Sequence, residues 1–161
     1  MRACTVHKSQ NPDSKRKGLS RDWQYLALAE CYAEAAVRLH GAREIETVCR
    51  PFFMLVAHAL ELSLKAVLSH QGYDEEGLMA MGHGLELCRS KAAEGGFHPS
   101  DETGLAILVD ALDRPHAFQA FRYPQALRWA DPGTAGVLSP LTQHLKAVKS
   151  FLGAQARPAR E

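Results

Sequence analysis

The stretch 50-RPFFMLVAHALELSLKAVL-68 is the longest run of this sequence that reads as a single buried helix. Its apolar residues fall into two helical series. The first contains Phe52, Leu55, Val56, Ala59, Leu62, Ala66 and Val67. The second contains Phe53, Ala57, Leu60, Leu64 and Leu68. A helix that is apolar nearly all round packs on several sides, so we expect this segment at the centre of the fold.

One narrow polar line interrupts this apolar surface. It contains His58, Glu61, Lys65 and Ser69, which fall within roughly an 80° arc at about 100° per residue. Glu61 and Lys65 stand at i and i+4 in the favourable order, so they can pair. Two interpretations stay open. The pair is a partly buried salt bridge that fixes how neighbouring helices dock, or the line is a polar groove for phosphate or a base. In that groove Lys65 supplies charge and His58 a proton or a hydrogen bond.

Composition places the chain among ordinary globular proteins. Its 161 residues are 46% apolar and 23% charged, with a formal net charge of +1. That balance suits one domain with its own core and gives no strong field toward nucleic acid or anionic membrane. The four cysteines form no CxxC pair, so we expect free thiols rather than a zinc site. We find neither an apolar run of ~18 residues nor a signal-peptide core, and we expect a cytoplasmic protein without membrane contact.

Helical periodicity recurs along the chain, and no segment alternates like a strand. We expect a flexible polar tail over residues 1–18, a helical domain over 19–153 and a frayed end over 154–161. The expected helices lie at about residues 20–40, 44–70, 83–93, 99–114 and 140–152, with loops at 73–82 and 116–134. Pro51 is either a first-turn proline or a bend in the second helix, and we favour the bend. The prediction is an all-α, up-and-down bundle of about five helices.

His83 lies between two glycines at the start of an expected helix. It can cap that helix or pack against the central one. A metal role would need partner ligands, and no HxH or HExxH motif is present. We therefore expect no metal and no cofactor.

The segment Phe121-Arg122-Tyr123-Pro124 combines two aromatic residues, an arginine and a proline in an expected loop. Arg122 can reach the central helix and pair with Glu61, or it can bind a phosphate with two parallel hydrogen bonds. The aromatic residues are expected to anchor the loop on the bundle. No Ser-His-Asp pattern or Gly-rich phosphate loop accompanies these residues, so no set of side chains is a strong catalytic signal.

The order of these residues resembles the HEPN superfamily of all-α domains. The resemblance rests on the segments His58-Ala-Leu-Glu-Leu-Ser-Leu-Lys-Ala-Val-Leu68, Gly72, His83-Gly-Leu and Phe121-Arg-Tyr-Pro124. It is strongest to a bacterial branch with an LELxLKA, H and FRYP pattern, and it spans about residues 20–153. The resemblance implies a bundle of four or five helices that forms a homodimer. Gly84 departs from the acidic or amide residue usual after that histidine, which implies a weaker helix cap.

Members of this superfamily include ribonuclease toxins, partners of nucleotidyltransferases and catalytically silent binding modules. The nucleases carry an arginine and then, after four to six residues, a histidine. No arginine of the expected helical domain meets that spacing. The nearest approach is Arg50 to His58, with seven residues between them. On a helix these side chains lie about 80° apart and about 12 Å along the axis, so they are poorly placed to act together.

We therefore expect a non-catalytic, homodimeric HEPN-like domain that binds nucleotide, RNA or a partner protein, in a toxin–antitoxin or defence setting. Glu61, Lys65, His83, Arg122 and Tyr123 are expected to form one polar cluster over the central helix, either structural or ligand-binding. The alternative is a metal-independent ribonuclease with an atypical Arg/His set, for which the candidates are His58, His83 and Arg122. A third hypothesis is a purely structural domain that serves a protein encoded nearby.

Overall fold

The computed structural model describes residues 18–41 and 45–154, and all regular secondary structure in these two ranges is helical. The α-helices of these ranges are α1 (Arg21–His40), α2 (Cys49–His70), α3 (Glu75–Ala80), α4 (Leu85–Glu94), α5 (Glu102–Ala117) and α6 (Thr134–Ala154). The predicted all-α bundle is thereby confirmed. Apart from residues 18 and 154, the expected N-terminal tail and frayed C-terminus lie outside the described residues.

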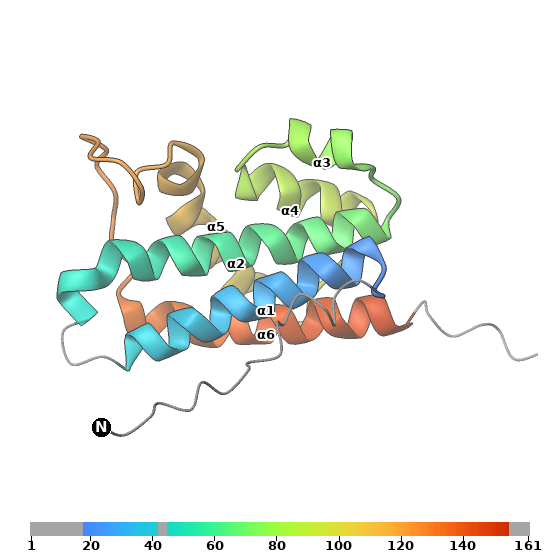
Figure 1. Ribbon diagram of the computed structural model, residues 1–161, viewed down its shortest axis with the longest axis horizontal. Helices are drawn as coiled ribbons and strands as arrows, with labels where there is room; N and C mark the ends of the chain where they lie inside the picture. The colour runs from blue at the N-terminus through green and yellow to red at the C-terminus, as the bar shows by residue number, and fades with distance from the viewer. Residues whose placement is uncertain (1–17, 42–44, 155–161) are drawn as a thin grey trace, which may run out of the picture.

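The three long helices α1, α2 and α6 lie side by side along the long axis of the molecule (Figure 1). Helices α4 and α5 contact the remaining side of α2, and the short α3 also contacts α2 (Figure 1). Helix α2 contacts every other described helix. The stretch that opens the sequence analysis is therefore the central element of the fold.

Burial of α2 explains why it takes this position. Its fully buried large side chains are Phe52, Phe53, Val56, Leu60, Leu64, Val67 and Leu68. Each is worth about 1.5–3 kcal/mol when taken out of water. On α1 the small residues Ala29, Ala33 and Ala36 are buried, which lets that helix approach α2 closely. Asp22 at the start of α1 and His70 at the end of α2 are joined at 2.7 Å, so the pair also fixes the register of the two helices.

Pro51 stands in the first turn of α2, where a missing N–H leaves no helical bond unmade. A short 3-10 helix, Ile45–Val48, leads directly into Cys49. The first-turn interpretation of the proline is therefore correct, and the α-helix bent at Pro51 that we favoured is not observed. Residue 44, the expected start of that helix, lies outside the described residues.

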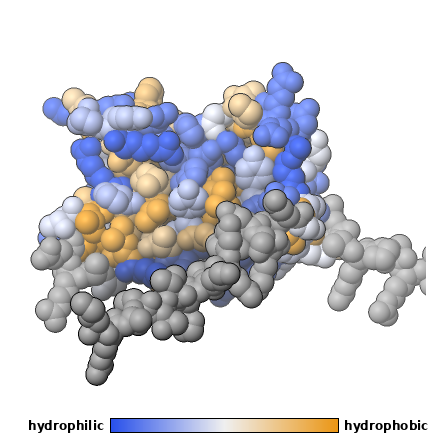
Figure 2. Space-filling view, viewed as in Figure 1, coloured by the Kyte–Doolittle hydropathy of each residue, from blue (hydrophilic) through white to orange (hydrophobic). Residues whose placement is uncertain are grey.

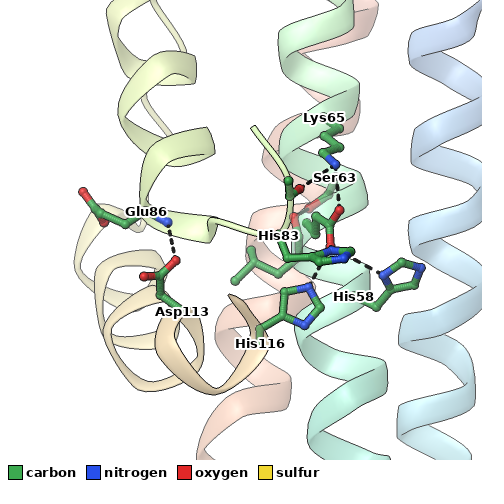
Figure 3. A network of polar contacts seen from close by, with 10 residues as sticks. His58, Ser63, Lys65, His83, Glu86, Asp113 and His116 are labelled. Atoms are coloured by element: carbon green, nitrogen blue, oxygen red, sulfur yellow. Dashed lines mark hydrogen bonds and ion pairs between the residues drawn. The ribbon is translucent and has the colours of Figure 1, made fainter. Parts of the chain in front are cut away.

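Carboxylates stabilise three of the helix starts, and at the start of α5 Asp101 accepts the Gly104 N–H at 2.8 Å. Asp74 accepts the Gly77 N–H at 2.9 Å and caps α3, a helix in the segment expected to be a loop. Helix α4 begins after Gly84, which has no side chain to offer. Asp113 of α5 instead accepts the Glu86 N–H at 3.0 Å (Figure 3). The weak cap implied by the sequence is thus supplied by a neighbouring helix.

Helix α5 runs through Pro115 to Ala117, past its expected end. A proline inside a helix leaves the carbonyl four residues earlier without its donor. That carbonyl belongs to Ala111, and it accepts the indole N–H of Trp129 at 2.6 Å. The helix continues because a side chain from the following irregular segment satisfies the orphaned group. This extra turn carries His116.

Helix α6 begins at Thr134, six residues before the expected start at Pro140. Pro140 falls in the second turn, so α6 lacks the one hydrogen bond that a residue there would donate to the carbonyl of Gly136. Val137, only 2% exposed, packs this added turn into the core. The expected irregular stretch is correspondingly shorter and covers residues 118–133.

By length and composition, the helical stretch Ile45–His70 passes as a membrane span, contrary to the expectation from its sequence. However, 78% of its most apolar window is buried inside the protein. The central helix of a bundle is also long and apolar. The contacts of α2 with every other described helix agree with such a central position.

Candidate functional site

The polar line of α2 faces the interior between α2, α4 and α5. Glu61 and Lys65 are only 3% and 8% exposed. The Lys65 ammonium donates to Glu61 Oε1 at 2.7 Å and to the carbonyl of Gly82 at 2.9 Å. Gly82 has φ of +57°, a conformation that glycine adopts without strain and that turns its carbonyl toward Lys65. Two of the three ammonium protons are thus directed inward.

Two histidines donate to the second oxygen of the same carboxylate (Figure 3). His83 Nδ1 lies 3.1 Å from Glu61 Oε2, and His116 Nε2 lies 2.7 Å from it. Because an ionised carboxylate only accepts, both ring nitrogens carry hydrogen. His116 comes from the extra turn of α5 and is 3% exposed, whereas the His83 side chain is 34% exposed. One buried carboxylate therefore gathers donors from α2, α5 and the segment before α4.

His58 completes this group but is not bonded to it. Its Nδ1 lies 3.7 Å from Glu61 Oε2, too far for a hydrogen bond, and it has no partner among the described residues. The imidazole packs edge-on against Tyr32 of α1, with ring centroids 4.5 Å apart. We refer to His58, Glu61, Lys65, His83 and His116 as the Glu61 cluster.

The protonation of Glu61 follows from its surroundings. Burial raises the pKa of this carboxyl group, but the hydrogen bonds from His116 and Lys65, the nearby His58 imidazole and the charge of Lys65 outweigh burial and hold the pKa well below its usual range. The Glu61–Lys65 pair is therefore ionic at neutral pH. A carboxylate so fully committed is an orienting group rather than a general acid.

Arg122 and Tyr123 do not join this cluster. Both are exposed, and no carboxylate among the described residues pairs with Arg122. Their backbone N–H groups bond to the carbonyl of Gln119 in a tight turn. Only Phe121 of this segment turns inward, where its ring stacks on Phe53 with centroids 6.1 Å apart. The expected anchoring of the loop therefore rests on one of its two aromatic residues.

Exposed arginine and aromatic side chains occur at the end of α5 and in this turn. Arg114 and Phe118 line a shallow hollow of about 310 Å³ at the end of α5, and the exposed Arg122 and Tyr123 lie in the turn that follows this helix. Phe118 is 59% and Tyr123 57% exposed. Hydrophilic residues predominate on this corner of the molecule, at the upper left of Figure 2. We call Arg114, Phe118, Arg122 and Tyr123 the arginine–aromatic surface.

A second buried histidine and a buried thiol lie outside both regions. His144 Nε2 lies 2.9 Å from Ser63 Oγ, which itself donates to the Leu60 carbonyl at 2.8 Å. The hydroxyl therefore accepts from His144, whose pKa burial lowers to about 4. Burial also raises the pKa of the Cys88 thiol to about 11, so this cysteine is not a nucleophile at neutral pH.

Sequence reasoning missed His116, the most buried donor of the cluster. The only sequence signal was its position after Arg114-Pro115, where a helix was expected to stop. Comparison of the chain with protein-family models, with curated proteins and with solved structures finds no match. The functional argument therefore rests on the geometry of the two regions.

Proposed function

We propose that this chain is a HEPN-like helical domain that works by binding and not by catalysis, and that it holds a nucleotide or a single strand of RNA on the arginine–aromatic surface. The observation that carries this proposal is the exposure of Arg122 and Tyr123 without an ion-pair partner among the described residues. Guanidinium groups bind phosphates with two parallel hydrogen bonds, and exposed aromatic rings stack on bases.

The Glu61 cluster supports the non-catalytic part of the proposal. Its one permanent cation, Lys65, is bonded to Glu61 and Gly82, so its charge is neutralised inside the protein. Phosphoryl transfer needs a cation or strong donors at the reacting phosphate. In this proposal the cluster orients α2 against α4 and α5, as a partly buried salt bridge with two added histidines.

RNA binding is measured by fluorescence anisotropy with a labelled single strand at two salt concentrations. Tyr123→Ala removes a stacking contact worth about 1–3 kcal/mol. Arg122→Ala weakens binding to all sequences alike and reduces the salt slope by about 1. Arg38→Ala is the matched control, because Arg38 is also exposed but pairs with Glu34 at 2.8 Å. Equal affinities for the control and both variants would refute the proposal.

A ribonuclease remains the second candidate function, because Glu61 orients the partly exposed imidazole of His83. With Nδ1–H bonded to Glu61, His83 keeps Nε2 as a potential base. The test is incubation of the purified protein with total RNA in EDTA. We expect no cleavage, and cleavage that His83→Ala abolishes would establish the nuclease.

The homodimer implied by the HEPN resemblance is part of the proposal, as is a protein partner encoded nearby in a toxin–antitoxin or defence system. Light scattering after size-exclusion chromatography measures the mass directly. A monomer at tens of micromolar would remove the dimer while leaving the RNA-binding proposal intact.

A further inference from the structure

We propose that His58, Glu61 and His116 form a binding site for a divalent transition-metal ion such as Zn²⁺. Each of the three residues offers one ligand atom, and these atoms all lie within 4.8 Å of one another. Two imidazole nitrogens and a carboxylate oxygen are a recurrent ligand set for zinc, with a fourth position left for water or a further group. This inference is independent of the proposed RNA binding.

The secondary structure places the ligands. His58 and Glu61 are separated by three positions on α2, so their side chains share one face of the helix. His116 is brought to the same point by the extra turn of α5 beyond Pro115. All three side chains are held on helices, and Figure 3 shows the rings of His58 and His116 in front of α2, on either side of the carboxylate. A site on packed helices holds its ligands more precisely than a site on loops.

The distances are close to those that zinc requires. Zinc–nitrogen and zinc–oxygen bonds of about 2.0–2.2 Å at tetrahedral angles put neighbouring ligand atoms ~3.3 Å apart. Glu61 Oε2 lies 2.7 Å from His116 Nε2 and 3.7 Å from His58 Nδ1. The first distance is shorter and the second longer than that value. Both distances differ from that value by less than 1 Å, but the three ligand atoms span up to 4.8 Å, so the two imidazole rings must move toward each other to enclose an ion.

His58 supplies the second observation. Its Nδ1 is buried, points at the carboxylate and has no hydrogen-bond partner among the described residues. A buried polar atom without a partner is costly unless water or an ion meets it. Metal coordination would satisfy this atom.

The rest of the cluster is compatible with an ion at this position. Lys65 bonds to Oε1 and leaves Oε2 as the metal-facing oxygen. The hydrogen on His116 Nε2 must leave that nitrogen, either for its own Nδ1 or for solvent, so that the lone pair can coordinate. The 34% exposed side chain of His83 marks the side from which an ion can enter.

Calorimetric titration of the full chain with Zn²⁺ tests the site. We expect one ion per chain, with His58→Gln and His116→Gln each weakening binding at least about tenfold. His98→Gln is the matched control, because His98 is exposed and also faces a carboxylate, that of Glu102, at 3.2 Å. Absence of binding, or equal binding by the His58→Gln variant, would overturn the site.

A second measurement needs no variant and so remains decisive if a substitution unfolds the protein. Nitrogen-15 NMR of the histidine rings, recorded with and without Zn²⁺, reports which nitrogens coordinate. We expect large shifts at His58 Nδ1 and His116 Nε2 and none at His98. Shifts confined to other histidines, or to none, would contradict the proposal. Co²⁺ loaded in place of Zn²⁺ should show no thiolate charge-transfer band, which separates this site from binding at a cysteine.

Discussion

The Glu61 cluster and the arginine–aromatic surface use similar residue types in opposite ways. In the cluster, one buried carboxylate accepts from Lys65, His83 and His116, so the charged groups neutralise each other inside the protein. On the surface, Arg122 is exposed and lacks such a partner among the described residues. The difference teaches that partner geometry, and not residue type, decides which polar group holds the fold and which is left for a ligand.

Substitution of Glu61 should cause the largest loss of stability, because it disrupts the Glu61 cluster and leaves the arginine–aromatic surface unchanged. Glu61→Gln removes the negative charge and leaves Lys65 buried without its counter-ion, a loss that costs about 3–5 kcal/mol. The free energy of unfolding is measured by urea denaturation. The control is Glu30→Gln, whose exposed pair with Lys149 at 2.9 Å is worth about 0–1 kcal/mol. Equal stabilities of the two variants would mean that the cluster does not hold the bundle.

Low pH should lower the free energy of unfolding through the buried groups His144 and Glu61, and the arginine–aromatic surface should not contribute to this loss. The pKa of His144 is about 4 in the folded protein and about 6.5 when unfolded, so the unfolded chain binds more protons between these values. Stability therefore falls as pH drops from about 6.5 to 4, by about 3 kcal/mol. The depressed pKa of Glu61 adds a further loss as pH falls below its ordinary value of 4.5.

The check is a series of urea unfolding curves across this pH range. His144→Leu should flatten the profile between pH 6.5 and 4, whereas Arg122→Ala should leave it parallel to that of the wild-type protein. A His144→Leu profile as steep as the wild-type one would assign the acid sensitivity elsewhere.

Trp129 supports the turn of α5 that carries His116, and its substitution should have a smaller effect. Trp129→Phe keeps most of the ring but removes the donor to the Ala111 carbonyl, at a cost of about 1–3 kcal/mol. Pro115→Ala restores an N–H that can take over this carbonyl. In the double variant the cost of Trp129→Phe should shrink. Additive effects in this double-mutant cycle would contradict the role assigned to Trp129.

Sequence patterns could predict the buried helix because its apolar series are long and regular. The pairing of Glu61 with Lys65 also follows from helical spacing alone, and the flanking glycines drew attention to His83. His116 could not be found this way. Its position depends on a helix that continues through Pro115, and that continuation depends on Trp129, fourteen residues later.

The exposed position of Arg122 could not be predicted from the sequence either. Charge complementarity allowed a pair with Glu61, but His116 occupies the place at the carboxylate that such a pair would need. The short helix α3 was missed for a different reason. Its six residues bury a single large side chain, Leu78, and so give no periodic signal, and only the Asp74 cap marks its start.

The most direct test of the contrast between the two regions is one RNA-binding experiment on two variants. Anisotropy titrations compare the wild-type protein with an Arg122→Ala/Tyr123→Ala double variant and with His83→Gln, which alters the only half-exposed member of the histidine group at Glu61. We predict that the double variant loses most of its affinity and that His83→Gln binds as the wild-type protein does. Loss of binding in His83→Gln with full binding by the double variant would contradict the account.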